Sequence, residues 1–150
     1  MNASMLAPAL LLFSMSAAAN ELCAAKIQEK DLHSIYVELM QPVQELSHGT
    51  NNPADEFLVS NLWYLLVEVT DLIAMGGETV LPMRDKLATD PQFVDQTAGG
   101  YFRKLRQIVD DVAGEMGKHQ SGIKTPAAAA SMEKARQGLV KVQAVLKDCT

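Results

Sequence analysis

The sequence predicts an all-α protein built as an up-down-up-down four-helix bundle. Four long segments carry apolar residues at the spacing of three and four that is typical of a helix face. No stretch of useful length alternates as a strand does, and no internal repeat is present. The connections are short, which favours antiparallel neighbours. The connection between the second and third helices allows a short extra helix around residues 78–88.

The first helix is expected over residues 21–46, where Leu32, Ile35 and Leu39 begin an apolar face that continues to Leu46. Pro42 interrupts this pattern and predicts a kink or an end near Met40. Residues 47–52 then form a loop by composition.

The second helix, residues 53–75, is the element around which the chain is organised. It carries the only Trp, and apolar residues cover more than half of its circumference, so most of it should be buried. Asn52 offers an N-cap, Pro53 suits the first helical position, and Asp55 and Glu56 favour the positive end of the helix dipole. The pair Gly76-Gly77 predicts its end.

A third helix is expected to follow Asp90-Pro91 and to run to Met116, with Gly99-Gly100 as a place where it could break. Residues 117–124 are typical of a loop. The fourth helix begins with Thr125 as cap and Pro126 at the first position. Its buried seam repeats every seven residues: Ala128, Met132, Ala135, Leu139, Val142, Leu146 and Cys149.

The first 19 residues contain no charged side chain and end in Ala17-Ala18-Ala19 after an apolar core. This pattern predicts a cleaved secretory signal, 1–19, followed by a single helical domain, 20–150. We therefore expect a periplasmic or secreted protein whose mature chain starts near Asn20.

Two cysteines, Cys23 and Cys149, lie near the two ends of the mature chain. An even number of antiparallel helices brings both ends together, and an oxidising compartment favours a disulfide between them. The alternative is two separate buried thiols.

Composition and motifs argue against nucleic-acid binding, a membrane span, a metal site and catalysis. The net charge of −5 opposes binding of nucleic acid, and Glu68 and Asp71 are costly in a membrane-spanning helix. Three histidines and no suitable spacing predict no metal site. No nucleophile motif is present, so we expect no cofactor and no enzymatic activity. Glu68 and Asp71 could serve as acid and base, but a solvated strip, or ion pairs to Arg103, Lys104 or Arg106, is the preferred interpretation.

The back half contains A-T-D-P-Q-F at residues 88–93 and ends in A-V-L-K-D-C at residues 144–149. In this respect it resembles the cytochrome c′ type of four-helix bundle. The resemblance implies the bundle fold, with Cys149 at the first cysteine of the haem-attachment motif. The second cysteine and the histidine of that motif are missing, so covalent haem is not expected. Non-covalent haem would need an inward ligand, for which Met40 and Met132 are candidates.

One face of the second helix predicts a protein-binding surface, because it interleaves apolar and acidic groups for a basic partner. Its residues are Phe57, Asn61, Tyr64, Glu68, Asp71 and Met75. The alternative is that Phe57 and Tyr64 pack under the loop at 47–52. The sequence thus favours an exported, non-enzymatic protein that binds another protein, as an inhibitor, an immunity protein or an envelope accessory factor. The second hypothesis is a small-molecule or non-covalent haem binder that uses the bundle core.

Overall fold

The computed structural model describes residues 23–149, and the predicted signal at 1–19 lies outside the described residues. Within residues 23–149 all regular structure is helical, so the predicted all-α class is confirmed. The α-helices are α2 (Glu29–Ser47), α3 (Pro53–Met75), α4 (Leu81–Lys86), α5 (Gly100–His119) and α6 (Pro126–Val145).

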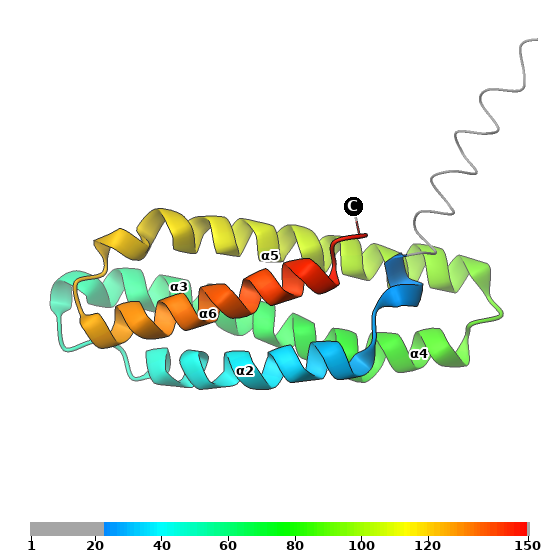
Figure 1. The fold of residues 1–150 in the computed structure, drawn as a ribbon, viewed down its shortest axis with the longest axis horizontal. Coiled ribbons are helices and arrows are strands. Elements are labelled where there is room, and N and C mark those ends of the chain that lie inside the picture. Colours follow the sequence, from blue (N-terminus) through cyan, green and yellow to red (C-terminus); the bar gives the residue numbers. More distant parts are fainter. Residues whose placement is uncertain (1–22, 150) are drawn as a thin grey trace, which may run out of the picture.

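The four long helices lie side by side, and consecutive ones run antiparallel (Figure 1). Helix α2 packs against α3 and α6, and α5 packs against the same two helices. Each long helix therefore has two neighbours and turns its apolar face to a shared core. That core is built mainly from aliphatic side chains, with Phe102 as its fully buried aromatic residue.

Helix α3 begins as predicted but does not end at the glycine pair. Asn52 Oδ1 accepts a hydrogen bond from the Ala54 N–H at 3.1 Å, as an N-cap should. The chain then continues through a π-helical turn, η1 (Gly76–Val80), into α4. Gly76 has ordinary right-handed helical dihedrals, and a Cβ there would lie 3.2 Å from the rings of Tyr101 and Phe102. The glycine permits close helix packing and does not cap the helix.

The predicted third helix continues past its expected end at Met116. A π-helical segment, η2 (Phe93–Gly99), continues into α5 without a break at Gly99-Gly100. The loop predicted at residues 117–124 is mostly wrong, because α5 runs to His119 and a 3₁₀ turn, η3 (Gln120–Gly122), follows it. Gly117 lies in the helix at an exposed position where a Cβ would meet nothing.

The predicted first helix is divided. Residues 23–26 form a short helical turn of their own, and α2 starts only at Glu29. The carbonyls of Ala24 and Ile27 accept hydrogen bonds from the Arg84 guanidinium of α4, which ties this turn to the neighbouring helix. Pro42 was predicted to kink or to end the helix near Met40. It does not end the helix, because α2 continues through a buried Pro42 to Ser47.

The last helix follows its prediction. Helix α6 begins at Pro126, and all seven residues of the predicted seam, including Cys149 just beyond the helix, are buried. Cys149 forms a disulfide with Cys23, with 5.0 Å between the two Cα atoms. The bridge predicted from the cysteine positions is confirmed.

Candidate functional site

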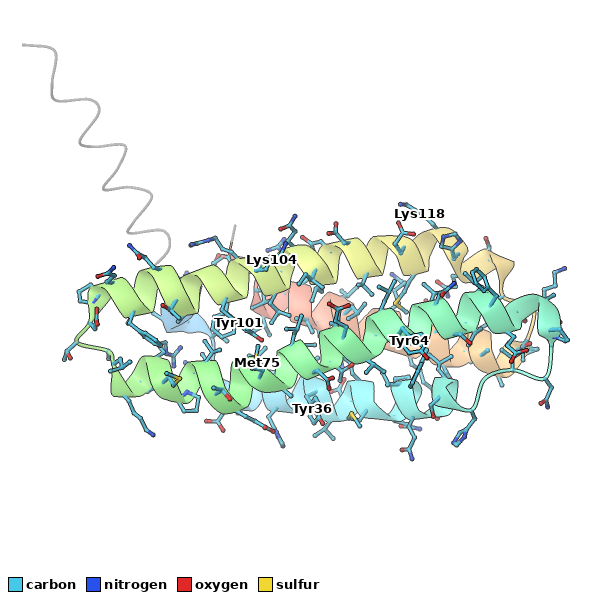
Figure 2. All side chains as sticks on the ribbon, turned by 180° about the vertical axis from the view of Figure 1, so that it is seen from behind. Tyr36, Tyr64, Met75, Tyr101, Lys104 and Lys118 are labelled. Carbon is cyan, nitrogen blue, oxygen red and sulfur yellow. A yellow bond between two sulfur atoms is a disulfide. The ribbon has the colours of Figure 1, made fainter. Side chains whose placement is uncertain are left out.

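The six residues predicted to bind a partner lie in a row on the solvent side of α3, and we call this row the α3 strip. Phe57 is 79% exposed, Tyr64 66% and Met75 44%, and the polar members are exposed as well. Figure 2 looks onto α3, with Tyr64 and Met75 labelled on it, α5 above and α2 below. The alternative that Phe57 and Tyr64 pack under the loop at 47–52 is wrong, because both rings face solvent. The strip consists of Phe57, Asn61, Tyr64, Glu68, Asp71 and Met75.

The strip belongs to the most acidic part of the chain. Residues 49–83 contain five carboxylates and no Lys, Arg or His. The whole chain has 18 acidic and 13 basic residues, so charges outside this segment cancel. Among the described residues, Glu68 and Asp71 form no ion pair, and the expected pairing with Arg103, Lys104 or Arg106 is absent there. Arg106 instead pairs with Asp110 of its own helix.

On its α5 side the strip is bordered by a tyrosine. The Tyr101 hydroxyl donates a hydrogen bond to the Leu72 carbonyl of α3. Burial raises the pKa of Tyr101 to about 12, so the hydroxyl stays protonated as a donor. Lys104 and Lys118 lie further out on α5 (Figure 2), where Lys118 pairs with Glu115 and Lys104 lines a cleft that also contains carboxylates. This flank therefore carries charges of both signs, whereas the strip itself is acidic.

On its α2 side the strip is bordered by apolar groups. The Trp63 Nε1–H donates a hydrogen bond to the Val43 carbonyl of α2 at 3.0 Å, and the Trp63 and Tyr64 ring centroids are 4.8 Å apart. Met40 is 41% exposed, and Tyr36 is half-buried. The sequence analysis missed Met40 as a surface residue. The signal was present, because Met40 lies off the apolar face that Leu39 and Leu46 define.

A second polar feature that the sequence analysis missed lies at the loop end of the bundle. Asp55 is 1% exposed, and its Oδ2 accepts hydrogen bonds from the Lys124 N–H at 2.9 Å, the Thr125 N–H at 2.6 Å and the Thr125 hydroxyl at 2.7 Å. The Thr125 hydroxyl, followed by these backbone donors, lowers the pKa of Asp55. Thr125 occupies the predicted N-cap position of α6, but its side chain makes no cap hydrogen bond there. Its hydroxyl donates to Asp55 instead, so Asp55 joins the starts of α3 and α6.

Other groups of chemical interest are dispersed. The described residues include no cluster of three or more His, Cys, Asp or Glu side chains that could hold a metal. Met40 is exposed and Met132 is buried, so the expectation that Met40 could serve as an inward haem ligand is wrong. The space between Tyr36 and Ala74 is only about 10 Å³, room for about one water molecule.

A larger open cleft of about 660 Å³ lies on α5 beside Cys149 and is lined partly by Arg103 and Arg106. The Arg103 Nη1 is buried and has no hydrogen-bond partner within the described part of the chain.

The continuous helix Pro53–Lys86 is long and apolar enough to cross a membrane by length and composition alone. Core helices and signal sequences meet the same criterion. That the chain does not span a membrane, which we expect because Glu68 and Asp71 are costly in lipid, therefore remains a prediction.

Together, the fold and the strip define an all-α helical protein with a disulfide between its terminal segments and one acidic, aromatic helix face. No protein-family model, no curated protein and no solved structure matches the chain. The resemblance to cytochrome c′ bundles therefore remains a prediction.

Proposed function

We propose that the chain is an exported, non-enzymatic protein that acts by binding another protein through the α3 strip. The observation that carries this proposal is the alternation, on one exposed helix face, of large apolar side chains with carboxylates that lack ion-pair partners among the described residues. Protein interfaces combine buried aromatic and methionine anchors with polar groups around them. An acidic rim steers a basic partner into place.

The contrast with the rest of the surface supports the same proposal. Among residues 23–149, seven of the eight exposed large apolar residues lie between Val37 and Leu87, on α2, α3 and the segment after them, and the eighth, Val140, lies on α6. Most exposed carboxylates elsewhere in this part of the chain are paired, as Glu38 is with Lys141 and Asp148 with Lys26. An inhibitor, an immunity protein or an envelope accessory factor would use such a surface. The disulfide is consistent with the oxidising compartment in which such proteins act.

The test is capture of the partner from the native envelope fraction by the immobilised protein. Tyr64→Ala removes a central aromatic anchor and Glu68→Lys reverses a rim charge, so each should weaken binding of the isolated partner by roughly tenfold or more. Helical content and melting temperature should stay nearly unchanged, because both side chains are exposed.

Two matched variants serve as controls. Val140→Ala removes an exposed apolar group from α6, and Asp111→Lys reverses an exposed charge on α5. Both should bind the partner as the unmodified protein does. The proposal is wrong if the two strip variants bind equally well, or if they lose binding only because they unfold.

A further inference from the structure

We propose that the partner segment is a basic amphipathic α-helix, and that it lies in the groove between α2 and α3. This inference rests on the proposed function. It adds the chemical class of the partner and a second wall of the site, made by Tyr36 and Met40 of α2.

Helix α2 supplies an apolar edge along the strip. The Trp63 ring of α3 is fixed to the Val43 carbonyl of α2, so the two helices touch at that level. Met40 and Tyr36 precede Val43 by three and seven residues, and residues at this spacing share one side of a helix. Tyr36 also lines a small space with Ala74 at the other end of the contact. The α2 edge formed by Tyr36, Met40 and Val43 is therefore apolar, and polar groups line only its far end beyond Tyr36.

The length and spacing of the strip indicate the shape of the occupant. The strip members follow one another at steps of four and three residues from Phe57 to Met75, a length of about 27 Å along α3. Two adjacent helices present a groove between their side-chain ridges, and a third helix can lay its own ridge into it. An amphipathic helix of about 18 residues has the matching length and anchor spacing.

Carboxylates line part of the groove. Glu68 and Asp71 lie along the groove, and Glu29 and Glu78 line the space at its Tyr36 end, where His33 is the single group of basic type. A partner helix with Lys or Arg beside its apolar ridge meets carboxylates along the part of the groove from Glu68 to the Tyr36 end. The α2 side combines these carboxylates with apolar groups, whereas the α5 side carries charges of both signs.

A second copy of the chain fits this groove less well. Packing α3 against α3 of another copy would bring like charges together, which is costly at an interface. The face of α6 offers lysines around the exposed Val140, but Lys134 and Lys141 already pair with Glu45 and Glu38 of α2. A separate basic helix makes the same contacts without breaking these pairs.

Peptide binding can be followed by the fluorescence emission of Trp63, because it is the only Trp of the chain and lies beside Tyr64. Two Trp-free 18-residue helical peptides would share the same leucine ridge, one carrying Lys and the other Glu at its flanks. We expect the Lys peptide to change the Trp63 emission at about tenfold lower concentration than the Glu peptide. High salt should reduce this difference, because it screens exposed charges.

Two sets of variants test the location. Met40→Asn should weaken binding of the Lys peptide by about tenfold, whereas Val140→Asn, at a similarly exposed residue of α6, should not. Glu68→Lys with Asp71→Lys should reverse the preference and favour the Glu peptide. Asp111→Lys with Asp148→Lys makes the same change in net charge away from the groove and should leave the preference for the Lys peptide intact.

The inference is overturned if both peptides bind equally, if Met40→Asn has no effect, or if sedimentation shows that self-association through the strip excludes the peptide. The proposed function fails separately, when Tyr64→Ala and Glu68→Lys leave capture of the native partner unchanged. Loss of capture in those variants together with no effect of Met40→Asn would leave a protein partner on α3 and remove the α2 wall.

Discussion

At the scale of single residues, Asp55 shows how a helix-start carboxylate becomes a contact between helices. The sequence assigned it only a favourable interaction with the helix dipole. In the structure it is buried and accepts hydrogen bonds from two backbone N–H groups and one hydroxyl at the start of α6. This role was not predictable, because the donors lie about 70 residues away in sequence and only the bundle brings them to Asp55.

Asp55→Asn should lower the melting temperature by several degrees at neutral pH. All three bonds go to Oδ2, so the amide oxygen can take its place, and the loss comes from the missing negative charge, which weakens these hydrogen bonds. The native state lowers the pKa of Asp55 below its ordinary value. Its stabilising effect is therefore fully present above that value and is lost as the pH falls through the lowered native pKa.

The measurement is the melting temperature of both proteins from pH 7 to pH 3. The difference between them should be largest near neutrality and should shrink at the acidic end. Glu56→Gln, at the exposed neighbouring residue, is the matched control and should change the melting temperature little. A difference that stays constant with pH would show that the charge of Asp55 contributes nothing to stability.

At the scale of elements, sequence patterns within a single helix predicted that helix correctly, whereas glycines did not predict where a helix ends. The seven-residue seam of α6 and the cap-plus-proline start of α3 were predictable, because each depends on neighbours within the same helix. The glycine pair at 76–77 was misinterpreted, because a stop and a close helix contact both select glycine. The π-helical segments η1 and η2 give no periodic signal, since each shifts the apolar pattern by only one residue.

The α3 strip shows the same limit for the site. Its exposure followed from the wide apolar arc on the opposite side of one helix, so Phe57 and Tyr64 could be placed from the sequence. The proposed second wall could not be placed from the sequence, because only the packing of α2 against α3 sets which residues of α2 lie beside the strip. Exposure of the strip is thus observed, whereas its role in binding remains a prediction.

Substitutions at two separate glycines, Gly138 and Gly114, test the packing of α2 against α6. In Gly138→Ala the added Cβ would lie 2.5 Å from Leu39 Cδ2 and 2.9 Å from its Cγ, and such overpacking costs about 1–3 kcal/mol. Alanine gains about 1 kcal/mol in helix propensity over glycine, so the net change should be a loss of up to about 2 kcal/mol. Gly114→Ala in α5, where a Cβ meets nothing within 4 Å, should instead gain about 1 kcal/mol.

Denaturant unfolding of the two variants measures both free energies. Repeating Gly138→Ala in a Leu39→Ala background isolates the contact, because the opposing side chain is then gone. In that background the substitution should become stabilising, as at Gly114. A loss of equal size in both backgrounds would mean that Leu39 is not the cause.

At the scale of the whole molecule, the chain places its net charge and its covalent bridge in different parts of the fold. The five uncompensated charges lie in residues 49–83, whereas the disulfide joins the turn before α2 to the residue after the α6 seam. The α3 strip is thus carried on a bundle whose first and last described segments are covalently joined.

The bridge should account for a large share of the stability. Cys23 and Cys149 are 126 residues apart in sequence, and the chain-entropy model gives about 5 kcal/mol for closing so long a loop. This is comparable to the net stability of a whole domain. Cys23→Ser with Cys149→Ser should therefore lower the melting temperature by on the order of 15 °C under oxidising conditions.

Reduction provides the control for this prediction. A reductant should bring the unmodified protein down to the melting temperature of the double variant and should leave the variant unchanged. Both cysteines are 2% exposed, so thiols must be counted by alkylation in denaturant without reductant. Two reactive thiols in that assay, or equal melting temperatures without reductant, would contradict the bridge. Because the α3 strip lies on a separate helix face, the double variant should still bind the partner below its own melting temperature.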